Sequence, residues 1–333
     1  MSAVRRLRAR TVAGIRRALH TSAARSPRFR RIVQVGAREL DRALHDELYD
    51  STYYGTADPG VEVGTFEYTR AKTHADEGAY IVWRWFPVTR TLDVGCAFGF
   101  FVEAERELGL DAEGVDVSQF ALDHAALGAR GHVRYGNLLH RLPVADGSYE
   151  LVSAFETLEH LPPEAVPTAL LELRRVTSGY LVATIPSFGP NEYGPGGWFE
   201  AKVTLDRTDY YKALGSDYEG PIPYDDLYRD ERGGPVEGHL TIASFAWWTR
   251  RFADAGFVRC GELEKRIHPH LARCGLTKYW NLYVLRVHDV PEPSGDARSP
   301  EDIAAVDARL GFDQRVADPE DIAMVRAVLG DVV

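Results

Sequence analysis

Two glycines and an acid give the first indication of chemistry. Gly95 and Gly99 lie in TLDVGCAFGFF (91–101), directly after a short apolar run, and glycine lets the backbone approach a ligand closely. Asp116 ends the next apolar run, about 20 residues after the glycines, where an acid can accept hydrogen bonds from both ribose hydroxyls. The spacing Gly-x-Gly-x-x-Gly that holds a pyrophosphate does not occur at this turn, so the residues predict a nucleoside that is not a dinucleotide. The alternative for the acid is a helix cap formed by Asp116 or Ser118.

Alternating strands and helices must position these residues. Such alternation indicates a parallel sheet with helices on both faces, and its ligands bind at the carboxyl ends of the strands. The last two strands follow each other directly and can pair antiparallel. We predict strands over 91–94, 112–117, 132–135, 149–154, 180–185, 257–267 and 280–287, and helices over 67–85, 100–108, 118–129, 163–176 and 242–255.

Three stretches of sequence, in the right order and spacing, carry a family resemblance. LDVGCAFGF, GVDVS and GNLLHRLPVADGSYELVSAFETLEHL resemble class I S-adenosylmethionine-dependent methyltransferases over about residues 88–187, with a weaker similarity over 238–257. GCAFGF is similar to the variant found in small-molecule enzymes of sugar, polysaccharide or natural-product biosynthesis. The resemblance implies an α/β fold: a Rossmann-like, doubly wound, mostly parallel sheet of seven strands whose last strand is antiparallel. Around it we expect an N-terminal helical extension, an insertion after the fifth strand and a C-terminal helical pair.

The same resemblance implies a binding site for S-adenosyl-L-methionine. The loop after the first strand would wrap the methionine part, with Asp93 orienting its amino group, and the acid after the second strand would take the ribose hydroxyls. Residues after the third strand would lie beside the adenine, and those after the fourth would line the pocket near the reactive methyl group. The cofactor residues implied in this way are Asp93, Gly95, Cys96, Ala97, Gly99, Asp116, Val117, Asn137, Leu138 and Phe155.

Two positions depart from the family pattern. Ala97 stands where the loop usually has a glycine, and we expect its methyl group to be tolerated because alanine can adopt negative φ. Asn137 replaces the usual acid beside the adenine, and an amide can both donate to and accept from an adenine edge. If both departures weaken cofactor binding, the chain is instead a catalytically weak scaffold that works by binding partners. That is the alternative from outside the enzyme class.

Candidate catalytic residues follow the fourth strand and the insertion. A sulfonium is already reactive, so alignment and exclusion of water supply much of the acceleration, while a hydroxyl acceptor benefits from a base. His160 in ETLEHL and His239 before the helix at 242 are the candidate bases, with Glu156 or Glu159 as substitutes. A helix-packing role for His160 and a loop-anchoring role for His239 are the structural alternatives.

The insertion at 187–238 is too long for a simple connection and predicts a cover over the acceptor. Aromatic faces and carboxylates suit a polyhydroxylated or aminated ligand, so we expect O-methylation of a polar small molecule such as a sugar, with N-methylation of an amino sugar or amine as the alternative. A solvated acidic loop packed on its own tyrosines is the other interpretation. Its aromatic and acidic residues are Tyr193, Trp198, Phe199, Tyr210, Tyr211, Tyr218, Tyr224 and Tyr228, with Asp206, Asp209, Asp217, Glu219, Asp225, Asp226 and Asp230.

Composition and charge narrow the class of protein. The 333 residues are 45% hydrophobic and 26% charged, which fits a globular protein. Three cysteines (Cys96, Cys260 and Cys274) are too few for a disulfide scaffold and, with no sign of a signal peptide, predict a cytoplasmic protein. Residues 1–38 hold 11 arginines and no acid, so the remainder of the chain carries −21. That acidity, and FETL in place of an Asn/Asp-Pro-Pro-aromatic tetrad, oppose a nucleic-acid substrate.

The two ends of the chain have their own patterns. The basic arm (1–38) can form an amphipathic helix, and a loosely docked tail, contact with an anionic membrane and a targeting segment all stay open. PEDIAAVDARLG (300–311) and PEDIAMVRAVLG (319–330) are an internal repeat, identical at nine of twelve positions, with helix starts and stops in each copy. We expect either a helical hairpin docked on the body or a homodimer contact.

The predicted organisation is a basic arm (1–38), a methyltransferase domain (39–288), a linker (289–299) and a helical tail (300–330). Within the domain we expect a cofactor half (88–187), the insertion (187–238) and a C-terminal part of the sheet (239–288). We predict no metal site. The spacing of His268, His270 and Cys274, with Cys260 nearby, matches no common zinc framework, and a magnesium site at Asp225 and Asp226 is equally disfavoured.

Overall fold

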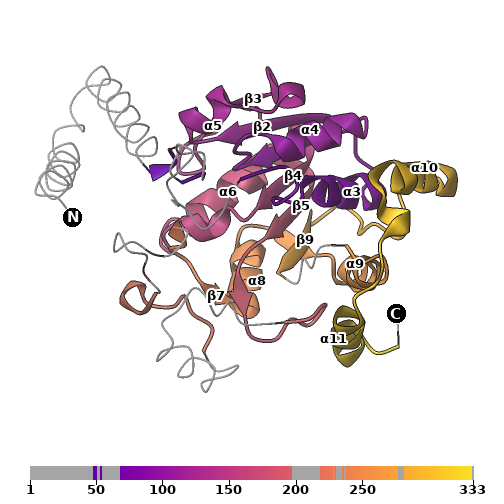
Figure 1. Cartoon of the computed structure of the whole chain (residues 1–333). Coiled ribbons are helices and arrows are strands. Elements are labelled where there is room, and N and C mark those ends of the chain that lie inside the picture. The colour runs from indigo at the N-terminus through magenta and orange to yellow at the C-terminus, as the bar shows by residue number, and fades with distance from the viewer. Residues whose placement is uncertain are drawn as a thin grey trace, which may run out of the picture. The chain divides into compact units, whose positions relative to one another are not determined.

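The computed structural model divides the chain into two compact units, 1–65 and 66–333 (Figure 1). It describes residues 48–50, 53–54, 68–196, 218–227, 229, 235, 238–276 and 281–331. The basic arm and more than half of the predicted insertion lie outside these residues. The fold below is that of the second unit.

A seven-stranded sheet with the order β3-β2-β1-β4-β5-β9-β8 forms the centre of this unit. Neighbouring strands from β3 to β5 pair in parallel, and β9 pairs antiparallel with both β5 and β8. The predicted fold class is therefore confirmed, including the antiparallel last strand. The strands are β1 (Arg90–Val94), β2 (Asp111–Asp116), β3 (Val133–Tyr135), β4 (Tyr149–Phe155), β5 (Thr177–Thr184), β8 (Phe257–Arg259) and β9 (Leu282–Val287).

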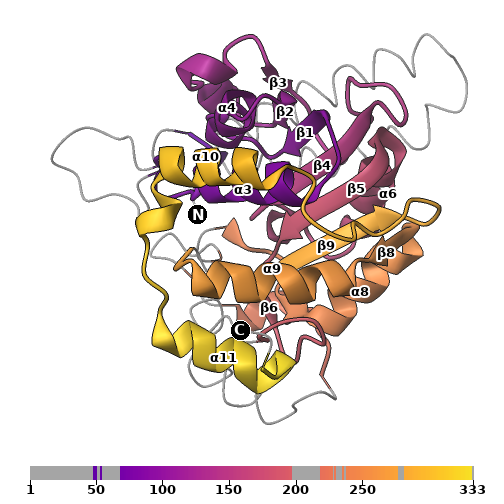
Figure 2. The ribbon, with the colours of Figure 1, turned by 90° about the vertical axis from the view of Figure 1, so that its right-hand side faces the viewer.

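Helices cover both faces of the sheet, as Figures 1 and 2 show. On one face α6 (Val166–Val176) and α8 (Phe245–Asp254) bury Leu170, Trp248 and Phe252 against the strands. On the other face α3 (Ala75–Trp85), α4 (Phe100–Glu107) and α9 (Gly261–Arg273) build a second cluster around Tyr80 and Ile267. Burying both faces leaves only the strand ends open to a ligand, as in other doubly wound sheets.

Two predicted helices are shorter in the structure. The helix expected from 67 begins at Ala75, after turns over 70–74. The helix expected over 118–129 breaks into α5 (Gln119–Asp123) and a 3₁₀ turn at Leu127–Ala129. Gly128 disfavours a helix in this segment, and the Ala126 amide donates to the Phe98 carbonyl at 2.8 Å instead of to a carbonyl of its own helix.

The predicted strand over 257–267 is wrong beyond its first three residues. After β8, helix α9 begins at Gly261 and runs to Arg273. Leu263, Ile267 and Leu271 recur every four residues and are fully buried, which is the helical period rather than the strand period. Pro269 lies inside this helix.

The two copies of the C-terminal repeat form α10 (Pro300–Leu310) and α11 (Pro319–Leu329), with Ser299 and Asp318 as side-chain caps. In Figure 2, α10 lies along α3 and α11 lies along α9. Ile303 of α10 joins the cluster under α3, and Val325 of α11 is fully buried. The helical pair is present, but its members dock at separate places rather than as the expected hairpin.

A two-stranded parallel sheet closes the insertion. Strand β6 (Ser187–Phe188) pairs with β7 (Ala243–Ser244), and the Ile222 amide donates to the Ile242 carbonyl at 2.8 Å. Both ends of the insertion therefore return to the same edge of the main sheet. Within the described residues, every helix is too short or too polar to cross a membrane.

Candidate active site

The loop after β1 turns sharply into α4. Gly95, Ala97 and Gly99 all have positive φ, at 80°, 46° and 71°. A Cβ atom on Gly95 would lie 2.3 Å from the Thr157 hydroxyl oxygen, so only glycine fits there. Our expectation of negative φ at Ala97 is wrong: the chain holds an alanine in the left-handed region, which is costly for residues with a Cβ. Such strain is concentrated at functional sites.

Asp116 fixes this loop to the tip of β2. One carboxylate oxygen accepts from the Ala97 amide at 2.8 Å and the other from the Ser118 amide at 2.7 Å. The Ser118 hydroxyl accepts from the Ala121 amide, so Ser118 is the side-chain cap of α5. Asp116 is 7% exposed and Val117 beside it is half-buried. A carboxylate is an acceptor with two oxygens, so an acid at this position suits the two hydroxyls of a ribose.

Asp93 near the end of β1 and Cys96 within the loop are both buried. Burial raises the pKa of Asp93 to about 7, although the Ser153 hydroxyl donates to its carboxylate at 2.9 Å and opposes the shift. The carboxylate of Asp116 raises it further. Burial also raises the pKa of Cys96, so this thiol stays protonated and contributes volume rather than nucleophilicity.

Asn137 and Leu138 follow β3 at the same edge of the sheet. Both are buried, and Leu138 belongs to the core cluster under the sheet. The side-chain oxygen of Asn137 accepts from the Leu139 amide at 2.8 Å. That bond orients the side chain from within its own turn.

Sequence reasoning missed Tyr68. Its ring packs edge-on against Phe98, with centroids 5.6 Å apart, and stacks near Phe100. Burial raises the pKa of its hydroxyl, and the carboxylates of Asp116 and Asp93 raise it further. Tyr68 therefore packs on Phe98 of the loop and Phe100 of α4, near enough to the two acids of the predicted site for their charges to act on its hydroxyl. No motif marks it in the sequence, and the predicted helix over 67–85 gave it no separate role.

Glu156 stands at the tip of β4 in a strained conformation, with φ at 47°. The Asn281 side chain donates to its carboxylate at 2.6 Å, and the Glu156 amide donates to the Thr184 carbonyl. The carboxylate is exposed at the strand ends. Phe155 before it packs against Phe101, with centroids 4.8 Å apart. Phe155 is thus held by its contact with Phe101, whereas the side chain of Glu156 is exposed to solvent.

His160 and His239, remote in the sequence, meet beyond β4. Their ring centroids are 4.9 Å apart and the rings are perpendicular. The Nε2 atom of His239 lies 3.8 Å from a carboxylate oxygen of Glu159. Glu159 and His239 are buried, whereas His160 is half-buried. We call these three residues the acceptor-side cluster, and we had considered Glu159 only as a substitute base.

The histidines of α9 do not form such a group. His268 is fully buried, and burial lowers its pKa to about 3. The Nε2 atom of His270 lies 3.1 Å from the Arg84 guanidinium and 3.6 Å from the sulfur of Cys274. Across the described part of the chain, the one group of three or more potential metal ligands is the acceptor-side cluster. Asp225 and Asp226 lie in a 3₁₀ turn, where Asp225 pairs with Arg229.

The described part of the insertion uses its aromatic residues in different ways. Tyr218 stacks on Phe188 and donates to the Pro221 carbonyl, so it has a structural role. Tyr193 packs under the Arg259 guanidinium. Tyr224 is 51% exposed. The remaining aromatics assigned to the acceptor lie outside the described residues: Trp198, Phe199, Tyr210, Tyr211 and Tyr228.

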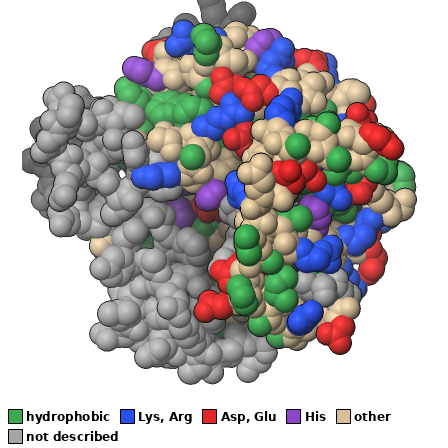
Figure 3. Space-filling model, turned by 45° about the vertical axis from the view of Figure 1, so that its right-hand side comes forward, with side chains coloured by type: hydrophobic (Ala, Val, Ile, Leu, Met, Phe, Trp, Pro, Cys, Tyr) green, Lys and Arg blue, Asp and Glu red, His purple; other side chains and the backbone are tan. Residues whose placement is uncertain are grey.

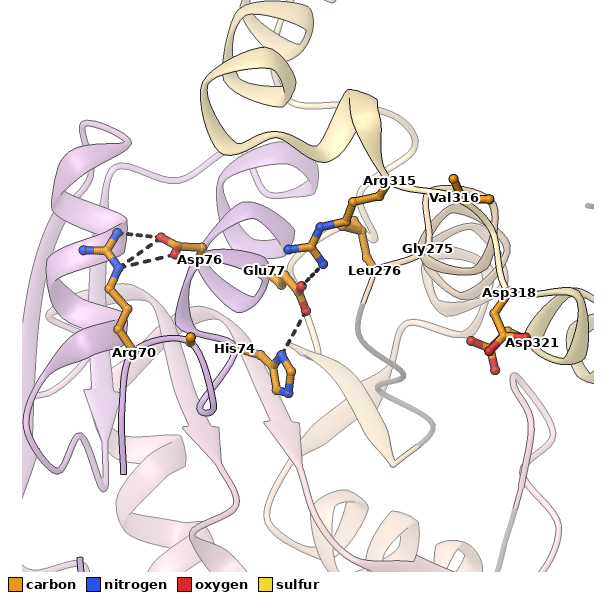
Figure 4. A pocket seen from close by; sticks show the side chains of 11 residues that line it. Arg70, His74, Asp76, Glu77, Gly275, Leu276, Arg315, Val316, Asp318 and Asp321 are labelled. Carbon is orange, nitrogen blue, oxygen red and sulfur yellow. Dashed lines mark hydrogen bonds and ion pairs between the residues drawn. The ribbon is translucent and has the colours of Figure 1, made fainter. Parts of the chain in front are cut away.

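A separate cleft of about 750 Å³ lies between the start of α3, the end of α9 and the connection from α10 to α11 (Figure 4). Several of its charged side chains pair with one another, while Asp318 and Asp321 add further acidic groups to its lining. Arg70 pairs with Asp76, and Glu77 pairs with both His74 and Arg315. On the face shown in Figure 3, acidic and basic side chains are likewise interspersed. We assign no ligand to this cleft.

Comparison with known proteins agrees with this geometry. Residues 92–182 match a family described as a methyltransferase domain, a segment that includes most of β1, the glycine loop, Asp116, Glu159 and His160. Residues 92–182 are therefore similar to a methyltransferase domain, a kind of domain that uses S-adenosyl-L-methionine as its cofactor.

The curated relatives are similar over this domain only. The ubiquinone biosynthesis O-methyltransferase of Bordetella avium is 35% identical over 92 residues, which are 25% of this chain and 37% of the relative. The enzyme with the same name from Cupriavidus pinatubonensis is 32% identical over 102 residues, 29% of this chain and 41% of the relative. The chain thus spans less than half the length of the curated relatives it matches.

Among solved structures, the magnesium protoporphyrin IX methyltransferase of Synechocystis is 16% identical, with 75% of this chain and 99% of that chain covered and a TM-score of 0.43. A protein of Pyrococcus horikoshii matches with a TM-score of 0.40 and 16% identity, over 64% of this chain and 89% of that one.

Proposed function

We propose that this chain transfers a methyl group from S-adenosyl-L-methionine to a hydroxyl of a polar small molecule. The main support for this proposal is the position of Asp116. Its carboxylate accepts hydrogen bonds from the Ala97 and Ser118 amides at the carboxyl edge of the sheet. That placement presents fixed acceptors to a ribose next to a loop that tolerates no side chain at Gly95. The names of the relatives, O-methyltransferases, support oxygen as the acceptor atom.

The chemistry needs alignment and a place for one proton. When bound, S-adenosyl-L-methionine supplies a methyl group on a positively charged sulfur, and the S–C bond breaks as the new O–C bond forms. Asp93, Asp116 and the loop 95–99 hold and orient the donor. The acceptor hydroxyl must release its proton, and His160, His239 and Glu156 are the proposed proton acceptors. Among them Glu156 is exposed at the strand tip and His160 is half-buried.

The acceptor class rests on the polar lining of this side. Histidine and glutamate side chains suit a ligand with several hydroxyl groups, such as a sugar or a glycosylated metabolite. A proton acceptor beside the strand tips favours a hydroxyl, because hydroxyls are weaker nucleophiles than free amines and gain more from a base. Methylation of an amine analogue in place of the matching alcohol would contradict this part of the proposal.

The test compares the two ends of the same strand. Asp116 ends β2 inside the site, whereas Asp111 begins β2 and is exposed. We expect calorimetric binding of S-adenosyl-L-methionine and of its demethylated product to the wild type and to Asp111→Ala. Loss of charge-assisted hydrogen bonds, each about 1.5–3 kcal/mol, predicts at least about a hundredfold weaker binding to Asp116→Ala. No binding to the wild type would make the scaffold alternative the better one.

A second measurement tests the bases. If the double variant His160→Ala/His239→Ala keeps wild-type turnover on an accepted substrate, the histidines are not the proton acceptors. Loss of turnover with unchanged cofactor binding would instead support their role on the acceptor side. The same assay with a deletion of residues 1–38 tests whether the basic arm contributes to catalysis.

A further inference from the structure

The acceptor-side cluster has the composition of a metal centre. Glu159, His160 and His239 each offer one donor atom, and the three atoms all lie within 4.8 Å of one another. We propose that Glu159, His160 and His239 bind one divalent metal ion of the zinc type at the acceptor side of the sheet. The sequence predicted no metal here, because the insertion separates Glu159 and His160 from His239 along the chain.

Main-chain hydrogen bonds bring the two parts together. The amides of Leu240 and Thr241 both donate to the Glu159 carbonyl, at 2.8 and 2.9 Å. The Thr241 hydroxyl donates to the Leu161 carbonyl at 2.6 Å. These three bonds attach the segment after Gly238 to the 3₁₀ turn Leu158–His160, so His239 is delivered by backbone structure rather than by a freely moving loop.

The donor set and spacing fit a borderline metal ion. Two imidazole nitrogens and one carboxylate oxygen are a donor set found in catalytic zinc sites, which keep a further position open for water or substrate. Bond lengths of 2.0–2.1 Å separate two donors on a tetrahedral ion by about 3.4 Å. Glu159 Oε1 and His239 Nε2 are already 3.8 Å apart, so small side-chain rotations bring the donors into range.

A purely structural ion pair is the competing explanation. Protonated His239 could neutralise Glu159 without any metal, since buried carboxylates require a partner. That pair would not need His160, whose ring lies 4.9 Å from His239. A third donor beside the pair, on the half-buried His160, is a feature that an internal ion pair does not require.

What the ion would do rests on the proposed function. At an open coordination position it would bind the acceptor oxygen and lower the pKa of that hydroxyl. Of the three proton acceptors proposed above, only Glu156 would then remain, with water as the other route for the proton, because both histidines would be metal ligands. Metal binding and cofactor binding are measured separately, so failure of one proposal is distinguishable from failure of the other.

The experiment uses the full chain, stripped with a chelator and titrated with zinc chloride, with bound metal counted by elemental analysis. We expect one ion per chain in the wild type. Glu159→Gln and His239→Gln should each weaken binding by at least about tenfold. His288→Gln, which removes a histidine 81% exposed at its side chain and outside the cluster, should bind as the wild type does.

Several outcomes would overturn the proposal. They are an absence of zinc uptake by the wild type, or uptake that Glu159→Gln and His239→Gln both retain. Circular dichroism and cofactor binding show whether a variant has folded. If Glu159→Gln fails to fold, His160→Gln, at a half-buried position, decides the question in its place. The visible spectrum of the cobalt-loaded chain, changed in His160→Gln, gives a readout that a structural ion pair would not produce.

Discussion

Two neighbouring parts of one sheet edge are built in different ways. On the cofactor side, the loop 95–99 and Asp116 come from consecutive elements and are joined by main-chain bonds such as Gly95 N–H to the Val115 carbonyl. On the acceptor side, Glu159 and His160 meet His239 from the far end of the insertion. The cofactor side therefore depends on backbone conformation and the acceptor side on the attachment of a distant segment, so substitutions should affect them separately.

We expect the largest loss of stability and of cofactor binding at Gly95, where a positive φ and close packing against Thr157 both require glycine. In Gly95→Ala the new Cβ meets Thr157 at 2.3 Å in a left-handed conformation, and overpacking with strain costs about 3 kcal/mol. Chemical denaturation should show this loss of stability, and calorimetry should show loss of cofactor binding.

Gly109→Ala is the matched control for Gly95→Ala. Gly109 also has positive φ, at 88°, but open space surrounds its missing Cβ. We expect it to cost only the backbone strain of about 1 kcal/mol and to leave cofactor binding intact. Equal losses of stability in the two variants would show that close packing against Thr157 does not define the cofactor loop.

The next effect is a pH dependence confined to the cofactor side. Burial raises the pKa of Asp93 to about 7, so the folded protein holds a proton there that the unfolded chain releases near its usual value of about 4. Between these values stability falls as pH rises, because the native state binds more protons. If Asp93 orients the cofactor amino group, binding requires the ionised form and strengthens about tenfold from pH 6 to pH 8.

Calorimetry at both pH values checks this, with proton release measured in two buffers of different ionisation enthalpy. Asp93→Asn removes the titrating group, so its affinity should be weak and flat across this range. A wild-type affinity that does not change with pH would show that Asp93 contacts the cofactor, if at all, in its protonated form.

A smaller effect should isolate the acceptor side. Thr241→Val removes the hydroxyl that donates to the Leu161 carbonyl and leaves a buried acceptor, which costs about 1–3 kcal/mol. Because this bond attaches the segment carrying His239, turnover should fall while cofactor affinity stays unchanged. Thr73→Val is a control, since its hydroxyl bonds a carbonyl in the turn before α3. If cofactor affinity in Thr241→Val fell as much as turnover does, the cofactor side and the acceptor side would not be independent.

The same contrast explains what the sequence could predict. The parallel sheet and the placement of Asp116 could be predicted from contiguous patterns, because strands alternate with helices along the chain and Asp116 ends the second apolar run. Helix α9 was missed because only Cys260 and Gly261 separate β8 from the helical pattern, and the prediction extended the strand through that glycine. The burial of Glu159 and the cover formed by Tyr68 arise from segments that meet only in three dimensions, and local sequence carries no trace of such meetings.

The smallest expected effect concerns Ala97, the departure inside the loop. Its φ of 46° costs an alanine about 1–2 kcal/mol, whereas glycine adopts this region freely but loses about 0.5–1 kcal/mol more backbone entropy on folding. Ala97→Gly should therefore raise the free energy of unfolding by about 0.5 kcal/mol, seen as a higher denaturation midpoint at unchanged slope. The amide that donates to Asp116 is kept, so cofactor affinity should be maintained. A lower midpoint would show that the Ala97 methyl group, which is buried in the loop, contributes more by packing than the strained backbone costs, and that the cofactor side also depends on side-chain contacts.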